Sequence, residues 1–430
     1  MSENLSSQIE EYLPNNILKF INFASEKAGY LHQELYLVGG VVRDLFLGRP
    51  NFDLDLVIEG DAVKLAHILA DETRGKLTDH PRFNTANLSY PDFSVDVAMA
   101  RSEIYSHPGA LPTVQPGHLI NDLIRRDFSI NAMAICLVPD RFGQLIDPHS
   151  GKEDIDNKYI RILHSNSFVD DATRILRAIR YEQRLGFKLE TETEKSLRYN
   201  VSMLDTISHD RLRHELNHIL IKEPVPERVF ARAEELGVLS KLHPHLKGNG
   251  WLSQKFARAR TIFRRISPPT IYLCLLAYNF DENELNRFSA RLNLPKSLAQ
   301  AILHAVQLRN RLNELTSEQL QPSDIYHILH TYNNQAIRAN LIATDSPIIE
   351  NHLKTYLDKL YYVKPILTGD NLLAMEIDSG PLLGELLQAL HDAKLNGELE
   401  TREQEEQFAH SFKRGQLNHN RYSPGSPDPT

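Results

Sequence analysis

Apolar residues change their spacing repeatedly along the first 150 residues, and each change marks a new element. Spacing of three to four residues predicts helices at 13–30, 41–47 and 61–75. Short apolar runs bounded by turn residues predict strands at 35–38, 52–59 and 94–99. Such alternation is typical of a mixed sheet covered by helices, so we expect an α/β region over the first part of the chain.

Strand signals nearly vanish beyond residue 165, and helical spacing dominates to about residue 410. We therefore predict an α/β head with a mixed sheet and flanking helices at 1–165, followed by an all-α remainder divided at 166–240, 241–360 and 361–413. Two stretches are expected to lack regular structure. Residues 101–119 carry prolines and glycines and predict a long loop, and residues 414–430 predict a disordered tail.

The composition is that of an ordinary globular protein, with 41% hydrophobic and 24% charged residues. Because the formal net charge is −8, any contact with nucleic acid must come from local basic patches. Cys136 and Cys274 stand far apart among apolar residues and are predicted to be buried free thiols, which favours a reducing, cytoplasmic setting. No apolar run predicts a transmembrane helix, and the polar N-terminal stretch does not resemble a signal peptide.

Two carboxylates, Asp53 and Asp55, stand two residues apart within one apolar strand. Side chains spaced in this way share a face, so both carboxylates point together while Leu54 and Leu56 face the core. Oxygen ligands on one face suit Mg²⁺, and two such ions could activate a hydroxyl and stabilise a leaving pyrophosphate. Asp96, on the next predicted strand, is a candidate third metal ligand. Taken alone, an Asp-x-Asp pattern is common on protein surfaces.

A glycine pair precedes these carboxylates. Gly39 and Gly40 end one predicted strand and open a helix, where backbone N–H groups can approach a triphosphate. Arg43 could add a charge-assisted contact to a phosphate. A glycine pair alone could equally make a turn.

Several segments, in a fixed order, carry a resemblance to a known family. They are residues 37–49 with 52–55, then 125–134, 145–151, 170–180 and 207–216. As a set they resemble the class II tRNA nucleotidyltransferases and bacterial poly(A) polymerases of the DNA polymerase β superfamily. The resemblance covers residues 35–220. It implies a catalytic head at 1–165, a base-recognising neck at 166–240, an RNA-binding body at 241–360 and a tail at 361–413 that grips the tRNA elbow.

A charged stripe bears on the choice of base. Asp171, Arg174, Arg177 and Arg180 recur every three residues on a predicted helix, which places them along one face. For an anonymous helix, a solvated charged face is the plain interpretation. However, cytosine and adenine both present an amino donor beside a ring-nitrogen acceptor, which a carboxylate next to a guanidinium matches, whereas guanine and uracil present the reverse. The resemblance implies that Asp171 and Arg174 read the incoming base.

The resemblance also assigns four residues to the ribose and triphosphate, namely Arg125, Arg126, Asp127 and Asn131. Three more are expected to brace the base-reading helix by ion pairs, namely Arg211, Arg213 and Glu215. The chain departs from the family at Asp170, where a glutamate is usual. The shorter side chain puts a supporting contact of the family in doubt.

Residues 254–265 alternate basic and apolar side chains and predict contacts with RNA phosphates. The candidate cations are Lys255, Arg258, Arg260, Arg264 and Arg265. A helix that buries its aromatic residues and leaves its arginines in solvent would give the same pattern. Residues 367–373 and 380–387 resemble the family's C-terminal segment, and a long helical arm suits recognition of a folded RNA by shape.

Three activities share these motifs: addition of the whole CCA end, addition of the terminal A alone, and poly(A) synthesis. The resemblance implies that CC-adding members have a shortened loop where this chain has residues 101–119, so CC addition is disfavoured, and residues 108–112 resemble a subgroup that includes A-adding enzymes. We expect a template-independent tRNA nucleotidyltransferase that adds CCA from CTP and ATP with two Mg²⁺ ions, with A-only addition as the first alternative. Asp53 and Asp55 argue against a non-catalytic RNA-binding protein. A phosphohydrolase built on His209 and Asp210 lacks an accompanying histidine cluster.

Overall fold

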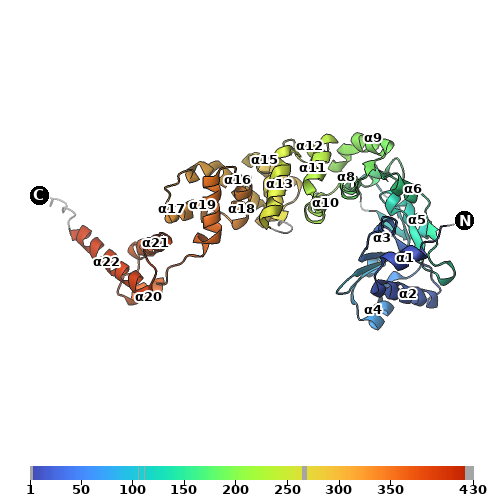
Figure 1. Ribbon diagram of the computed structural model, residues 1–430, viewed down its shortest axis with the longest axis horizontal. Helices are drawn as coiled ribbons and strands as arrows, with labels where there is room; N and C mark the ends of the chain where they lie inside the picture. The colour runs from blue at the N-terminus through green and yellow to red at the C-terminus, as the bar shows by residue number, and fades with distance from the viewer. Residues whose placement is uncertain (1–2, 105, 111, 264–268, 422–430) are drawn as a thin grey trace. The chain divides into compact units, whose positions relative to one another are not determined.

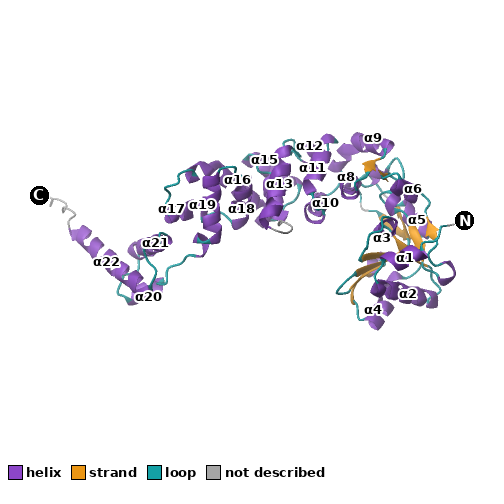
Figure 2. Cartoon of the chain, in the orientation of Figure 1, coloured by secondary structure: helices purple, strands orange, loops and turns teal. Residues whose placement is uncertain are grey.

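The computed structural model describes residues 3–104, 106–110, 112–263 and 269–421. They form two compact units, which are described separately. The first comprises the chain up to residue 249 together with 291–293, and the second comprises the remaining residues from 250. The first unit holds a β-sheet, helices that pack on it and a further helical part, and the second is built from helices (Figure 1 and Figure 2).

A seven-stranded mixed sheet forms the centre of the first unit, with strand order β3-β4-β5-β2-β1-β8-β9. Its strands are β1 (Leu35–Val38), β2 (Asp53–Ile58), β3 (Lys76–His80), β4 (Thr85–Ser89), β5 (Ser94–Met99), β8 (Ala134–Cys136) and β9 (Leu145–Ile146). Strands β2 and β5 pair parallel, and the other neighbours pair antiparallel. The predicted α/β class with a mixed sheet is confirmed.

Four helices cover this sheet; three lie where the apolar spacing predicts helices, and the one at residues 6–12 was not predicted. They are α1 (Ser6–Tyr12), α2 (Asn15–Tyr30), α3 (Gly40–Phe46) and α4 (Ala62–Thr73). Helix α2 buries Ile17, Phe20, Ile21 and Ala24, which recur at helical spacing. Helix α4 begins where the Asp61 carboxylate accepts a hydrogen bond from the Lys64 backbone N–H at 3.0 Å, which satisfies a donor that the helix cannot.

The predicted loop at 101–119 is wrong in part. Strands β6 (Arg101–Ile104) and β7 (Thr113–Pro116) pair antiparallel there, and helix α5 (Leu119–Ile124) follows. The prolines of this stretch lie in the connection or in β7, whose only partner in the two-stranded sheet is β6. A strand with one neighbour leaves half of its backbone groups outside any ladder, so proline is tolerated in it. Tyr105 and Leu111 lie outside the described residues.

The rest of the first unit is mainly helical, and its helices are α6 (Gly151–Asp156), α7 (Ser167–Asp170), α8 (Thr173–Leu185), α9 (Thr191–Asn200), α10 (His209–Lys222), α11 (Pro226–Glu235) and α12 (Leu239–Leu242). A short parallel pair, β10 (Tyr159–Ile160) and β11 (Lys188–Leu189), flanks α8. Helix α8 buries Ile175, Leu176 and Ile179. Ion pairs tie it to its neighbours, with Arg232 of α11 at 2.8 Å from Glu182. Helix α8 is therefore held on several sides.

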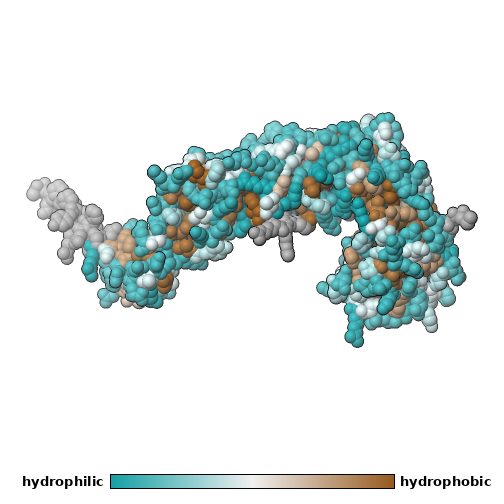
Figure 3. All heavy atoms as spheres, in the orientation of Figure 1, coloured by the Kyte–Doolittle hydropathy of each residue, from teal (hydrophilic) through white to brown (hydrophobic). Residues whose placement is uncertain are grey.

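The second unit contains α13 (Gly250–Phe263), α14 (Pro269–Leu276), α15 (Glu282–Arg291), α16 (Lys296–Arg311), α17 (Pro322–Leu329), α18 (Asn334–Ala343), α19 (Pro347–Asp358), α20 (Gly369–Ala374), α21 (Pro381–Leu395) and α22 (Arg402–Arg421). One apolar core gathers Leu308, Leu329, Leu353 and Tyr356. Figure 3 shows hydrophilic residues over much of the visible face of this unit. No described helix is long and apolar enough to cross a membrane.

Two expectations about the chain meet different outcomes. Cys136 and Cys274 are buried and free, as predicted. The disorder predicted from residue 414 is wrong for 414–421, because α22 continues to Arg421. The prolines that end helical sequence begin only at Pro424, beyond the described residues.

Candidate active site

A cavity of about 830 Å³ opens in the first unit, between the sheet and helices α8 and α10. Of the predicted catalytic and nucleotide-binding residues, those that line it are Gly39, Gly40, Arg43, Asp55, Asp96, Arg125, Arg126, Asp127, Asn131, Asp171, Arg174 and Arg177. Asp53 and Arg180 do not line it. The fold thus brings together residues from segments far apart in the sequence.

Strand β2 presents its two aspartates on one face, as the alternation predicts. Leu54 and Leu56 are buried, whereas Asp53 is exposed and Asp55 is partly exposed. The parallel register sets Asp55 opposite Asp96 of β5. Asp53 Oδ1 accepts a hydrogen bond from Ser94 Oγ at 2.6 Å. Three carboxylates therefore lie along two neighbouring strands.

These carboxylates concentrate negative charge. Burial raises the pKa of Asp55 to about 6, Arg126 opposes the rise, and Asp96 and Asp53 add to it. A divalent cation would favour the ionised form, and an all-carboxylate donor set suits Mg²⁺. Within the described ranges, no three acidic, histidine or cysteine side chains already form a metal cluster. Substrate phosphate oxygens would have to complete the coordination of an ion here.

Gly39 permits the closest approach of charged groups to the backbone. Its φ is 77°, and an added Cβ would lie 2.8 Å from Arg126 Nη1 and 3.0 Å from Asp55 Oδ2. A side chain at this position would therefore be strained and would also displace both groups. The glycine that the sequence offers as a turn residue is needed for the packing of the site.

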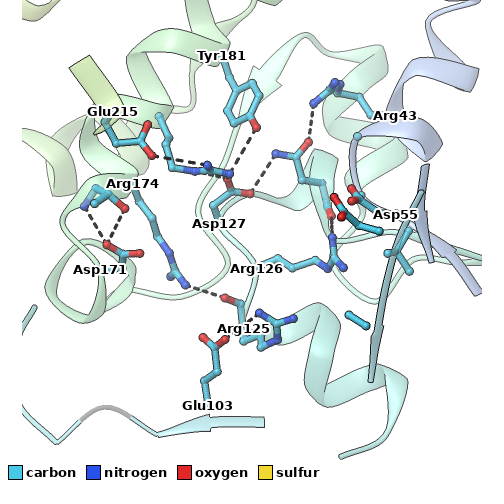
Figure 4. Close-up of a pocket in the computed structure, with 18 of the residues that line it drawn as sticks. Arg43, Asp55, Glu103, Arg125, Arg126, Asp127, Asp171, Arg174, Tyr181 and Glu215 are labelled. Carbon is cyan, nitrogen blue, oxygen red and sulfur yellow. Dashed lines mark hydrogen bonds and ion pairs between the residues drawn. The ribbon is translucent and has the colours of Figure 1, made fainter. Parts of the chain in front are cut away.

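A chain of hydrogen bonds crosses the cavity wall (Figure 4). Arg43 Nη1 donates to Asn131 Oδ1 at 2.7 Å, and Asn131 Nδ2 donates to Asp127 Oδ1 at 3.0 Å. Asp127 Oδ2 accepts from Arg177 Nε at 2.9 Å. Burial alone would raise the pKa of Asp127, but Arg177 and Asn131 lower it to about 2. The carboxylate is thus ionised and fixes two arginine-bearing elements.

Arg125 and Arg126 share one buried anchor that the sequence analysis missed. Asp122 is fully buried, and its two oxygens lie 2.5 Å from Arg125 Nη2 and 3.0 Å from Arg126 Nη2. Arg125 Nη1 also donates to Glu103 Oε1 at 2.9 Å. The spacing of three and four residues from Asp122 was the available signal, because such side chains meet on a helix.

Asp171 is not on the helix where the sequence analysis put it. Helix α8 begins at Thr173, and Asp171 has an extended backbone. Its Oδ1 accepts from the Thr173 N–H at 3.0 Å and from Arg211 Nη2 at 2.7 Å. Arg174 Nη1 donates to Ser167 Oγ at 2.7 Å, and its Nη2 donates to the Arg125 carbonyl at 2.6 Å. Both side chains nevertheless line the cavity, because Asp171 lies only two residues before the first residue of the helix that carries Arg174.

The residues of α8 that line the cavity are Thr173, Arg174, Arg177, Tyr181 and Arg184, but not Arg180. A step of three residues falls about 60° short of a full turn, so a stripe drawn at strict threes drifts around the helix. Counting from Arg174, steps of three, four and three residues stay on one face of the helix and would have identified Tyr181 and Arg184. Arg180, which the even spacing put on the same stripe, is buried and does not line the cavity.

Helix α10 closes another side of the cavity. Ser208 caps it by accepting a hydrogen bond from the Arg211 N–H at 3.3 Å, and Arg211, His214 and Glu215 line the cavity. Arg211 pairs with Asp171, and Glu215 Oε1 lies 3.9 Å from Arg177 Nη1. The expected bracing therefore holds for these two.

Arg213 instead lies 2.8 Å from Asp210 of its own helix, so bracing by Arg213 is wrong. The structure gives no support to the phosphohydrolase alternative. Asp210 lines the cavity, but its neighbours there include arginines.

The predicted RNA-binding cations of α13 have other partners. Lys255 is fully buried and pairs with Asp345. Arg258 donates to the Thr344 carbonyl and to Glu350 Oε2, the latter at 2.6 Å. Lys255 and Arg258 therefore bind partners within the second unit, because both side chains lie on the face of α13 that packs against the rest of that unit. Arg260 is half-buried, and Arg264 and Arg265 lie outside the described residues.

Comparison with known proteins identifies two family descriptions. "Poly A polymerase head domain" matches residues 35–161, and "Probable RNA and SrmB-binding site of polymerase A" matches residues 186–248. An A-adding tRNA nucleotidyltransferase of Halalkalibacterium halodurans is 32% identical, covering 96% of each chain. One of Geobacter sulfurreducens is 32% identical over 95% of this chain, which spans 49% of that relative's length.

Solved structures give the same picture. The apo form II of a CCA-adding enzyme superposes with a TM-score of 0.81 at 32% identity, covering 95% of this chain and 99% of the other. A Thermotoga maritima CCA-adding enzyme complexed with tRNA gives a TM-score of 0.74 at 31% identity, covering 96% and 99%. The match along nearly the whole chain agrees with the head sheet, the arginine-rich cavity and the helical remainder. The chain belongs to the tRNA nucleotidyltransferase family with a poly(A) polymerase head domain.

Proposed function

We propose that this protein adds nucleotides to the 3′ end of tRNA without a template, using CTP and ATP and releasing pyrophosphate. One observation carries the proposal: a base-reading pair, Asp171 and Arg174, and a metal-suited carboxylate, Asp55, line the same cavity. The printed names of the relatives, A-adding and CCA-adding enzymes, support it.

Asp53 and Asp55, with Asp96 beside them, would hold two Mg²⁺ ions. Ions so held would activate the 3′-hydroxyl and stabilise the leaving pyrophosphate. Arg126, which lies close to Asp55 and Gly39, and Arg43 would hold phosphate oxygens by charge-assisted hydrogen bonds. Asp122 and Asn131 keep these guanidinium groups oriented before a nucleotide enters.

The base would be selected by its Watson–Crick edge. Asp171 Oδ1 is occupied by Arg211 and Thr173, and Oδ2 accepts no hydrogen bond from the described residues. Oδ2 is therefore available to the amino group of cytosine or adenine. Arg174 is held by Ser167 and the Arg125 carbonyl, and its remaining N–H groups can serve the ring nitrogen. Guanine or uracil would leave buried polar groups unpaired.

Addition of the whole CCA end is the activity that this pair favours, because cytosine and adenine share the edge that it recognises. A-only addition is the second candidate, and the names of the relatives from Halalkalibacterium halodurans and Geobacter sulfurreducens favour it. The second unit would bind the tRNA.

The test is incubation of the protein and Mg²⁺ with tRNA lacking CCA and with tRNA ending in CC, each with CTP or ATP alone and with both. CCA addition predicts incorporation of CTP on the first RNA and of ATP on the second. A-only addition predicts ATP incorporation on the second RNA alone. Absence of transfer in every combination would contradict the proposal, and long A tails on unrelated RNA would indicate poly(A) synthesis.

A further inference from the structure

One aromatic ring stands among the arginines of the cavity. The ring centroid of Tyr181 lies 5.5 Å from the guanidinium carbon of Arg43, 5.6 Å from that of Arg177 and 5.4 Å from that of Arg180. A cation within roughly 6 Å of a ring centroid is attracted by the negative face of the ring. Since a ring has two faces, at least two of these cations share one. Figure 4 shows the Tyr181 side chain directed toward Arg177.

Two of the three cations are already fixed from another side. Arg43 donates to Asn131 Oδ1 and to Asp44 Oδ1, and Arg177 donates to Asp127 Oδ2. Both line the cavity together with Tyr181. A further carboxylate would cancel the positive charge that phosphate oxygens need, whereas an uncharged ring attracts both cations and leaves their charge available.

Arg180 differs from the other two. Its side chain is 4% exposed, and neither Nε nor Nη1 has a hydrogen-bond partner in the described part of the chain. The Glu223 Oε1 atom lies 3.8 Å from Arg180 Nε and also accepts from Arg184. Burying guanidinium nitrogens without hydrogen bonds is costly, so the Glu223 carboxylate and the ring of Tyr181 both compensate for the charge of Arg180.

We propose that Tyr181 is a positioning residue that orients Arg43 and Arg177 toward the nucleotide triphosphate, and that Arg180 acts on both through the same ring. The inference rests on the proposed function, because it takes the triphosphate as the anion in the cavity. Arg180 then contributes to nucleotide affinity from outside the cavity wall, as one of three cations that share the ring.

The experiment compares Tyr181→Phe, which keeps the ring and removes only the hydroxyl that accepts a long hydrogen bond from Arg177 Nη2 at 3.4 Å, with Tyr181→Leu, which removes both. The readouts are KM for ATP and kcat on saturating tRNA ending in CC, and the Kd for ATP measured without RNA. Tyr181→Phe is expected to stay within about twofold of the wild type, and Tyr181→Leu to raise both KM and Kd about three- to tenfold with little change in kcat. The affinity for tRNA should not change.

A double-mutant cycle tests the part of Arg180. Arg180→Met should raise the Kd for ATP in the wild-type protein and add nothing to Tyr181→Leu, because the ring through which it acts is then absent. An unchanged Kd in Tyr181→Leu, equal damage from Tyr181→Phe, or additive effects in the cycle would overturn the inference.

Thermal unfolding shows whether each variant is folded. Should Tyr181→Leu fail to fold, Arg180→Met and Tyr181→Phe still decide, since the inference requires weaker ATP binding in the first and not in the second. If the wild type transfers no nucleotide to any tRNA, the proposed function fails, and the ATP affinities of the variants still test the role of the ring.

Discussion

The basic residues of the cavity and those of α13 look alike in sequence, but their charged groups have different interaction partners. In the cavity, Arg126 and Arg174 are anchored through part of the guanidinium and line an open space. On α13, Lys255 is fully buried against Asp345, and Arg258 donates to backbone carbonyls and a carboxylate. For Lys255 and Arg258, alternation of basic and apolar residues therefore predicts the helix but not the partners of the charges.

The largest effect is expected when the metal-suited carboxylates of β2 are neutralised. Asp53→Asn and Asp55→Asn keep the shape of the side chains and remove the charge that would hold Mg²⁺. Since a metal ion contributes several kcal/mol of transition-state stabilisation, each variant should lose more than about a hundredfold in kcat. Radiolabelled ATP incorporation measures the loss, and a filter-binding assay should give an unchanged tRNA affinity. Turnover near that of the wild type in either variant would remove the metal assignment.

On the other side of the comparison, Lys255→Ala should affect stability and not RNA binding. Removing a buried four-carbon side chain leaves a cavity, and the free energy of unfolding should fall by about 2–4 kcal/mol in urea denaturation. Lys255→Met is the matched control, because it fills the space and leaves Asp345, whose side chain is 76% exposed, in water. Weaker tRNA binding with unchanged stability in Lys255→Ala would mean that the ammonium does reach RNA.

Acid should loosen the cavity wall through Asp127. The pKa of this carboxyl is lowered to about 2 in the folded protein, against about 3.9 in an unfolded chain. The carboxylate therefore contributes stability, about 2 kcal/mol, that is present above pH ~4 and is lost as the pH falls toward 2. The difference in unfolding free energy between the wild type and Asp127→Asn should shrink over this window. A difference that stays constant from pH 7 to pH 2.5 would show that Asp127 does not carry the charge.

Much of the fold follows from patterns along the sequence that need no tertiary information. The runs at 35–38 and 94–99 become β1 and β5, and the alternation around Leu54 places the aspartates correctly. Strand β3 lies at the sheet edge and β4 lies beside it, and both carry mainly polar or partly exposed residues, so their apolar signal is weak.

Residues of the candidate site that belong to a sequence motif were predicted. Residues whose only link to the site is their packing against other side chains were missed. Asp122 and Tyr181 contact arginines of the cavity, and these contacts appear only once the fold brings the side chains together. Arg180 was misplaced because a period of three was used where the helix turns every 3.6 residues. Lys255 was misassigned because burial of a lysine against Asp345, far along the chain, leaves no local sequence signal.

The central claim, that Asp171 and Arg174 choose the base, is tested most directly by competitive incorporation of the four NTPs by Asp171→Ala. The RNAs are tRNA ending in CC and tRNA lacking CCA. Loss of the Asp171 acceptor leaves Arg174 able to hold a carbonyl, so incorporation of U or G relative to A or C should rise about ten- to a hundredfold, even if total activity falls. Because Arg211 pairs with Asp171, Arg211→Ala is the companion variant and should relax selectivity less. Unchanged selectivity in Asp171→Ala with activity retained would mean that the base is read elsewhere.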